Sequence, residues 1–203
     1  MIRPPISPNT DSTFGRHIFG IDEVGLGPLA GPLVAVCCAI DLQNSPDITV
    51  NDSKKLSEKQ REKIFSSILL YKNKKIYWGY GIITAPDLDR LGIPKALELA
   101  VHKAYSRCLT PFIPDHILID GNRKYDFPYP STSIIKGDSK HYTIAMASII
   151  AKVLRDRWMI VLDRLYPEFG FAKHKGYGTK QHLSVIQSGL SSPHHRYSYA
   201  PFR

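Results

Sequence analysis

The sequence has few cysteines and no long apolar run. Its 203 residues include three cysteines, two of them adjacent at positions 37 and 38, and none at the C-x-x-C spacing of a zinc site. This pattern excludes a disulfide framework and indicates buried thiols. No segment approaches the roughly 18 apolar residues that span a membrane, and residues 1–15 lack the apolar core of a signal peptide. We therefore expect a cytoplasmic protein with no membrane partner.

Acidic residues are fewer than basic ones, and the difference is largest in two segments of the chain. The sequence has 27 Lys and Arg against 18 Asp and Glu, a formal net charge of +9. Segment 171–203 contains five basic residues and no acid, and segment 51–75 contains eight basic residues against three acids. Such an excess favours a polyanionic partner, because phosphates attract the protein and release counterions on binding. A lysine run is also typical of a solvated helix face, so neither segment alone identifies a nucleic-acid site.

The periodicity of the chain predicts an α/β fold, a mixed sheet covered by helices. Strands are expected at 17–24, 33–40, 76–84, 116–120 and 132–136, and helices at 58–71, 94–108, 141–165 and 180–189. A Ser57–Gln60 capping box begins the first helix, and Asp138 or Ser139 is expected to cap the long one. The length suits one main domain. We expect it at 17–165, preceded by a loose tail at 1–16 and followed by a basic helical extension at 166–203.

Three carboxylates stand at the ends of predicted strands. Asp22 and Glu23 lead directly into the Gly/Pro-rich loop 25–32, and Asp120 ends the strand 116–120. Sites form at the strand ends along one edge of an α/β sheet, and an acid buried there is costly unless something neutralises it. The alternative is that Asp22 and Glu23 are only turn residues and that Asp120 belongs to an ordinary Asp-Gly turn.

A fourth carboxylate, Asp156, lies within the long predicted helix. It shares one helix face with Ser148 and Lys152 at a spacing of four residues. We expect that face to pack near the same sheet edge, so that the four carboxylates converge. The alternative for Asp156 is an ion pair with Lys152, Arg155 or Arg157.

Four converging carboxylates would repel one another, and divalent cations would relieve the repulsion. Ligands that are all oxygen select Mg²⁺ or Mn²⁺ over zinc. Two such ions about 4 Å apart activate water and stabilise the leaving oxygen in phosphodiester hydrolysis. Together with the basic segments, this chemistry favours a metal-dependent nuclease. The alternative is a non-catalytic binder of hybrid or structured nucleic acid, with the acids serving as ion pairs.

Several motifs, in order over about residues 18–200, resemble ribonuclease HII, the type 2 ribonuclease H family. They are Gly-Ile-Asp-Glu-Val-Gly at 20–25, Gly-Pro-Leu-Ala-Gly-Pro at 27–32, Asp-Ser-Lys-Lys-Leu at 52–56, Ile-Asp-Gly-Asn at 119–122, Lys-Gly-Asp at 136–138, the helical segment 147–156 and Gly-Tyr-Gly-Thr at 176–179. The resemblance implies an RNase H-like fold, with a mixed five-stranded sheet flanked by helices and a small C-terminal helical extension. It also implies a monomer.

The resemblance implies an endoribonuclease that hydrolyses the RNA strand of RNA–DNA hybrids and single ribonucleotides embedded in duplex DNA. It implies two Mg²⁺ or Mn²⁺ ions, 5′-phosphate and 3′-hydroxyl ends, and a role in ribonucleotide excision during DNA replication and repair. The catalytic and metal-binding residues it implies are Asp22, Glu23, Asp120 and Asp156. The substrate-binding residues are expected to be Gly25, Leu26, Gly27, Ser53, Lys54, Lys55, Lys136, Ser148, Lys152 and Tyr177, of which the last packs on the sugar at the RNA–DNA junction.

The loop after the acidic pair departs from the family. Relatives usually have Gly-Arg-Gly there, whereas this chain has Gly25, Leu26 and Gly27. The two glycines can still bring backbone N–H and C=O groups to a ribose 2′-OH, the group that distinguishes RNA from DNA. A leucine side chain cannot bind phosphate, so the contribution of the arginine is absent unless a nearby lysine replaces it.

Overall fold

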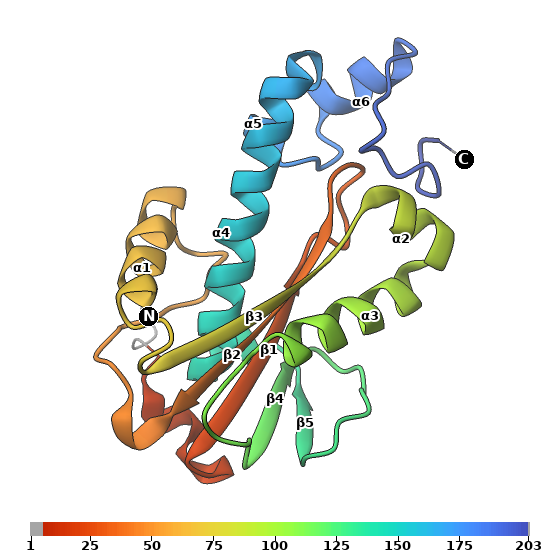
Figure 1. Cartoon of the computed structure of the whole chain (residues 1–203). Coiled ribbons are helices and arrows are strands. Elements are labelled where there is room, and N and C mark those ends of the chain that lie inside the picture. The colour runs from red at the N-terminus through yellow and green to blue at the C-terminus, as the bar shows by residue number, and fades with distance from the viewer. Residues whose placement is uncertain (1–5, 203) are drawn as a thin grey trace.

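A mixed five-stranded sheet forms the centre of the molecule (Figure 1). The computed structural model of the chain describes residues 6–202. The strand order is β3-β2-β1-β4-β5; β2 pairs antiparallel with both β1 and β3, whereas β4 is parallel to β1 and to β5. The strands are β1 (His17–Val24), β2 (Leu33–Asp41), β3 (Ile76–Ile83), β4 (His116–Asp120) and β5 (Ser131–Ile134). This confirms the predicted mixed sheet flanked by helices.

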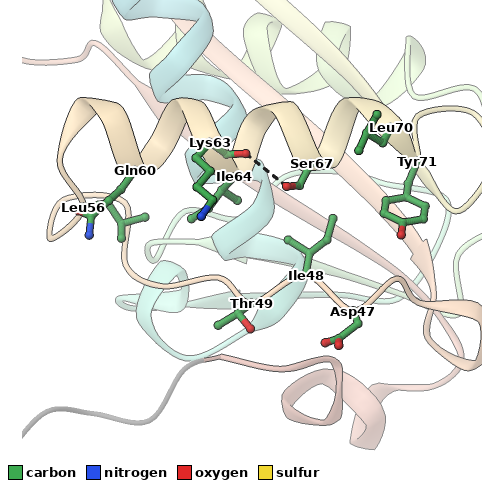
Figure 2. Close-up of a pocket in the computed structure, with 10 residues that line it drawn as sticks. All are labelled: Asp47, Ile48, Thr49, Leu56, Gln60, Lys63, Ile64, Ser67, Leu70 and Tyr71. Atoms are coloured by element: carbon green, nitrogen blue, oxygen red, sulfur yellow. Dashed lines mark hydrogen bonds between the residues drawn. The ribbon is translucent and has the colours of Figure 1, made fainter.

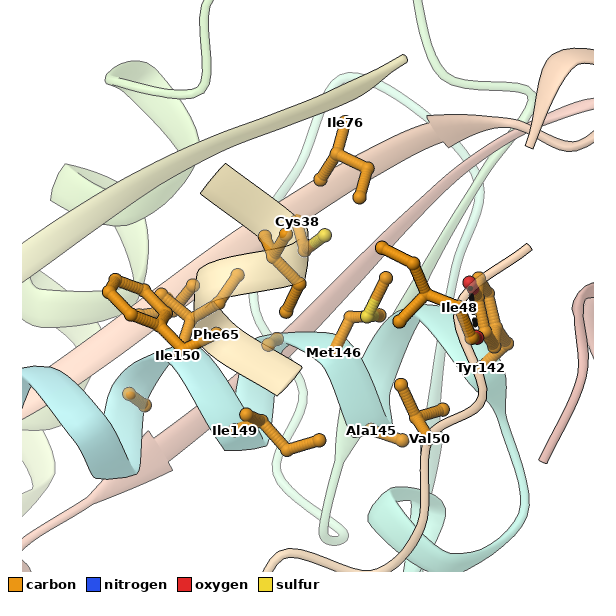
Figure 3. Close-up of a cluster of buried hydrophobic side chains, with 14 of the residues drawn as sticks. Cys38, Ile48, Val50, Phe65, Ile76, Tyr142, Ala145, Met146, Ile149 and Ile150 are labelled. Atoms are coloured by element: carbon orange, nitrogen blue, oxygen red, sulfur yellow. Dashed lines mark hydrogen bonds between the residues drawn. The ribbon is translucent and has the colours of Figure 1, made fainter. Parts of the chain in front are cut away.

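Helices cover both faces of the sheet, and β2 shows why. Its alternate side chains point to opposite faces, and its residues are buried on both, apart from the partly exposed Asp41 at its end. One face packs against α1 (Glu58–Leu70) and the long helix α4 (Tyr142–Leu165), a cluster seen in Figure 3. The other packs against α2 (Ala85–Leu91) and α3 (Ile93–Ser106). Cys37 and Cys38 are buried on opposite faces of β2, in agreement with the prediction of buried thiols.

α4 lies directly on β1, and one glycine makes this approach possible. A Cβ at Gly20 of β1 would collide with the backbone of Thr143 and Ile144 in the first turn of α4. The close contact allows the helix to run along the strand that carries Asp22. No helix within residues 6–202 is both long and apolar enough to cross a membrane.

The predicted loose tail is wrong for residues 6–16. A 3₁₀ helix, Pro8–Phe14, buries Asp11 completely. The carboxylate of Asp11 accepts hydrogen bonds from the N–H of Tyr142 at 2.9 Å and of Thr143 at 2.8 Å. It thereby satisfies two of the free N–H groups at the start of α4. Residues 1–5 of the predicted tail lie outside the described part of the chain.

The predicted cap of α4 is therefore also wrong. Neither Asp138 nor Ser139 caps the helix, because both lie in a separate 3₁₀ turn, Gly137–Ser139, and the N-cap residue of α4 is His141. The capping box at the start of α1 is confirmed, with both reciprocal hydrogen bonds between Ser57 and Gln60 formed.

The segment after α4 folds back over the loop 25–32. It contains the short helices α5 (Phe171–His174) and α6 (Lys180–Gln187). Phe169 and Phe171 pack on Met159 and Leu162 of α4 and on Ala30 of the loop. The proposed domain boundary coincides with the end of α4 at residue 165, and it remains a proposal.

Candidate active site

Three carboxylates meet at the carboxyl ends of β1 and β4. One oxygen each of Asp22, Asp120 and Asp138 lies within 4.8 Å of the other two. Among residues 6–202 this is the only group of three or more acidic, histidine or cysteine side chains with that spacing. Because β1 and β4 are parallel and Ile21 pairs with Ile119, the next residues along, Asp22 and Asp120, stand side by side.

The electrostatics of this group favour a bound cation. Asp22 is only 4% exposed, and burial raises the pKa of its carboxyl well above the ordinary value; the charges of Glu23 and Asp120 raise it further, and a hydrogen bond from Ser148 opposes them. Burial likewise raises the pKa of Glu23 to about 7, with a further contribution from Asp120. Burial and the charge of Asp138 raise the pKa of Asp120. A cation would offset all three effects, and ligands that are all oxygen suit Mg²⁺ or Mn²⁺.

Asp138 is the site residue that the sequence reasoning missed. It is 3% exposed, and its Oδ2 accepts a hydrogen bond from Lys54 Nζ at 2.9 Å. A signal was present in the Lys-Gly-Asp motif at 136–138. Lys136 is left-handed, with φ 57°, and the N–H of Gly137 donates to Asp120 Oδ1 at 2.6 Å. This turn presents Asp138 to the carboxylate at the end of β4.

The structure does not bring Asp156 to this group. Lys152 Nζ lies 2.7 Å from Asp156 Oδ1, and Arg61 Nη2 lies 3.6 Å from Oδ2, so two cations already neutralise the carboxylate. Ser148 and Asp156 share one helix face, as predicted. Ser148 lies close enough to Asp22 to lower its pKa, whereas Asp156 lies eight residues further along α4, about 12 Å at 1.5 Å per residue. The ion pair with Lys152 that was expected as the alternative is formed.

Glu23 occupies a different position from Asp22. Successive strand residues point to opposite faces, and Glu23 is absent from the close group of three. Its N–H donates to Asp22 Oδ1 at 2.7 Å, and its charge interacts with Asp120 and Lys54. It therefore borders the group at the end of β1.

The structure brings only some of the predicted substrate-binding residues to the carboxylates. Ser53 and Lys54 lie at the carboxylates, since Ser53 Oγ is 2.7 Å from Ser148 Oγ and Lys54 contacts Asp138. Lys55 is paired instead with Asp52 at 3.8 Å, and the ammonium of Lys152 is occupied by Asp156.

The loop 25–27 and Tyr177 come together in a second part of the predicted binding surface. A Cβ at Gly27 would have Tyr177 Cε1, at 3.9 Å, as its only neighbour within 4 Å. The Tyr177 side chain is exposed. Leu26 packs against the core cluster beneath α3. The leucine that replaces the family's usual arginine is therefore an anchor of the loop.

A surface hollow lies apart from the carboxylates. It runs between α1 and the segment 47–49, with Ile48, Ile64 and Leu70 among its lining residues (Figure 2). None of the residues predicted for the site lines it.

The fold and the acidic group together define a nuclease with an RNase H-like fold. The ribonuclease HII family model matches residues 19–201. A ribonuclease HII from Magnetococcus marinus is 44% identical over 189 residues, which cover 93% of this chain and 86% of that protein. The chain belongs to the ribonuclease HII family. It is a metal-dependent endoribonuclease, a hydrolase of phosphodiester bonds with ribonuclease H activity on RNA–DNA substrates.

Solved structures agree with this family. The crystal structure of ribonuclease H2 from Pyrococcus horikoshii OT3 has a TM-score of 0.73 and 26% identity, and the match covers 92% of this chain and 95% of that one. Ribonuclease HII of Archaeoglobus fulgidus, solved as a complex with PCNA, has a TM-score of 0.66 and 26% identity, with 88% and 93% covered.

Proposed function

We propose that this ribonuclease cuts both the RNA strand of RNA–DNA hybrids and single ribonucleotides embedded in duplex DNA, leaving 5′-phosphate and 3′-hydroxyl ends. The catalytic carboxylates are Asp22, Asp120 and Asp138, with Glu23 beside them. The observation that carries the proposal is the convergence of three buried or half-buried carboxylates within 4.8 Å at the end of the central strands.

These carboxylates would hold two Mg²⁺ or Mn²⁺ ions. Bound ions would supply the positive charge that activates a water molecule and stabilises the leaving oxygen of a phosphodiester. The protein contributes a rigid, oxygen-lined support. Asp22 is held by the N–H of Glu23, and Asp120 by the N–H of Gly137. Fixed ligands of this kind lower the reorganisation needed during reaction.

Lys54 and the basic segments would bind the phosphate backbone. The Lys54 side chain is 74% exposed although its ammonium pairs with Asp138, so it can turn to a phosphate when cations neutralise the carboxylates. Phosphate contacts of this kind position a duplex without reading its sequence.

Selection of a ribonucleotide would fall to the loop 25–27 and Tyr177. The open space over Gly27, bordered by the Tyr177 ring, suits a sugar that packs on the aromatic face. The N–H groups of Leu26 and Gly27 form no hydrogen bond with any group in residues 6–202, and they are available to a 2′-OH. A site that reads one ribose supports cutting at a single embedded ribonucleotide.

The test is a cleavage assay on three labelled duplexes of one sequence: all DNA, DNA with one ribonucleotide, and an RNA–DNA hybrid. Each is incubated with Mn²⁺, with Mg²⁺ and with excess EDTA, and the product ends are mapped. We expect metal-dependent cutting of the second and third duplexes only. Binding without cutting would instead support the non-catalytic alternative, and cutting in EDTA would exclude the metal mechanism.

A further inference from the structure

Two arginines are buried behind the loop 25–32 without an acidic partner. Arg155 of α4 and Arg196 of the C-terminal segment are both 0% exposed. Neither guanidinium forms a salt bridge to any carboxylate of residues 6–202. Burial, and then the charge of Arg196, lower the pKa of Arg155 to about 10. A buried charge is retained at such a cost only where its hydrogen bonds are satisfied.

Backbone carbonyls of the loop satisfy both guanidiniums. Arg196 donates to Gly25 O at 2.6 Å, to Leu26 O at 3.0 Å and to Gly31 O at 2.8 Å. Arg155 donates to the carbonyls of Ala30 at 3.1 Å and of Pro32 at 2.9 Å, and to that of Lys175, which precedes the Gly-Tyr-Gly-Thr motif. The planar fork of arginine can join several carbonyls at once, which a single ammonium cannot do in the same geometry.

This arrangement determines which backbone groups the loop offers to a ligand. In a trans peptide the C=O and the N–H point in opposite directions. Because the carbonyls of Gly25 and Leu26 point at Arg196, the N–H groups of Leu26 and Gly27 point away from it. The Leu26 carbonyl also accepts from Tyr199 Oη at 2.8 Å, so both of its lone pairs are used. The loop therefore presents donors to a ligand, with positive charge behind them.

The C-terminal segment is held in place to deliver Arg196. The backbone N–H of Arg196 donates to Leu29 O at 2.8 Å, and the N–H of Gly31 donates to His194 O at 2.8 Å. On the other side, the Asp89 carboxylate of α2 accepts from the N–H of Tyr197 at 2.7 Å. The segment is thus hydrogen-bonded to both the loop and α2. It packs behind the loop, on the side opposite the N–H groups of Leu26 and Gly27.

We propose that Arg196, assisted by Tyr199 and Arg155, is a positioning residue that orients the N–H groups of Leu26 and Gly27 toward an oxygen of the bound ribonucleotide. The inference rests on the proposed function of the loop. It differs from the expectation that both N–H and C=O groups read the ribose, because the carbonyls are engaged by the protein. The 2′-OH is accordingly read as an acceptor.

The test is a binding measurement in an Asp120→Asn background, which is chosen to prevent cutting. Fluorescence anisotropy compares a DNA duplex carrying one ribonucleotide with the same duplex in all-DNA form. We expect Arg196→Lys to reduce the preference for the ribonucleotide about tenfold, the scale of one charged hydrogen bond, and to leave all-DNA affinity unchanged. Tyr199→Phe, which removes one bond to Leu26 O, should reduce the preference about two- to fivefold, the scale of one neutral hydrogen bond.

Tyr197→Phe is the matched control. Its hydroxyl contacts Ser191 and Ser192 in the same segment and does not reach the loop, so the preference should be unchanged. If Arg196→Lys does not fold, the Tyr199→Phe result decides. A preference that persists in the folded variants, or an equal loss on both duplexes, overturns the positioning role. If the parent protein itself shows no preference for the ribonucleotide, the proposed function of the loop fails first.

Discussion

The ammonium nitrogen of Lys54 lies 2.9 Å from Oδ2 of Asp138, so a side-chain cation is paired with one of three clustered carboxylates. The hydrogen bond to Asp138 raises the pKa of Lys54, which keeps the ammonium charged. Asp138 is buried while most of the lysine side chain is exposed. A divalent cation and the ammonium therefore compete for the same carboxylate.

Lys54→Ala should bind Mn²⁺ more tightly in the absence of nucleic acid. The competing ammonium is removed while the carboxylates stay in place, so the dissociation constant should fall about threefold or more. Titration calorimetry without substrate measures this. Lys55→Ala is the matched control, because Lys55 pairs with Asp52 and does not contact the site. Weaker or unchanged Mn²⁺ binding by Lys54→Ala would argue against competition at Asp138.

Both lysine variants should weaken binding to all duplexes alike. Phosphate contacts carry no sequence information, and losing one of them should lower the salt dependence of the binding constant. Anisotropy titrations from low to physiological salt measure the slope. A binding constant of the parent protein that does not change with salt would exclude phosphate contact as the main contribution.

Asp22→Asn should raise the melting temperature of the metal-free protein. The raised pKa of Asp22 means that its charged form costs stability at neutral pH, and the amide removes that charge. A gain of about 1 kcal/mol corresponds to roughly 2–4 °C in a chain of this size. Added Mn²⁺ should stabilise the parent protein but not the variant. A variant that melts well below the parent protein would indicate a structural role for Asp22.

Acid should weaken the packing of the C-terminal segment. Burial, and then the charge of His182, lower the pKa of His195 to about 4, and His182 Nε2 lies 3.0 Å from His195 Nε2. Since an unfolded histidine has a pKa near 6.5, the neutral form favours folding. This stability is fully present above about pH 6.5 and is lost as the pH falls toward 4.

The raised pKa of Glu23, about 7, acts with the opposite sign, because protonating that carboxyl stabilises the fold as the pH falls. The histidine effect is therefore measured as a difference. Urea unfolding of the parent protein and of His195→Gln between pH 7.5 and 4.5 should show a steeper acid loss in the parent. Parallel pH profiles would exclude His195 as a source of acid sensitivity.

The two glycines that flank Leu26 should respond differently to alanine. Gly25 has φ +96°, and a Cβ there would collide with the Arg155 side chain. Gly25→Ala should therefore destabilise the fold by about 1–3 kcal/mol. At Gly27 the nearest atom is Tyr177 Cε1 at 3.9 Å, so Gly27→Ala should fold normally and raise KM on a single-ribonucleotide duplex. Melting curves and steady-state kinetics separate the two effects. Normal KM in Gly27→Ala would show that no sugar approaches there.

Local patterns in the sequence predicted most of the fold. Strand β1 was predicted with its exact bounds, and the capping box located the start of α1, because both signals depend on neighbouring residues. Asp22 and Asp120 were predicted to lie close together because both stand at strand ends, and they do. What the sequence could not show depends on contacts between distant segments.

Asp138 and Asp11 illustrate that limit. Asp138 joins Asp22 and Asp120 only because the turn after β5 folds over the end of β4, so its role is set by tertiary packing. Asp11 caps a helix that begins 131 residues later. Arg196 likewise meets Gly25 across 171 residues. For Asp156, helical spacing correctly predicted the face it shares with Lys152 but could not show that Arg61 of α1 joins Lys152 in neutralising it.

The most direct test of the account compares Asp138→Asn with Asp156→Asn. Both are measured in Mn²⁺ on a duplex with one ribonucleotide, after melting curves show that both fold. We predict that Asp138→Asn lowers kcat about a hundredfold or more, the scale of losing one preorganised electrostatic group, and that Asp156→Asn keeps most of the activity. Full activity in Asp138→Asn together with loss in Asp156→Asn would contradict the assignment of the catalytic carboxylates.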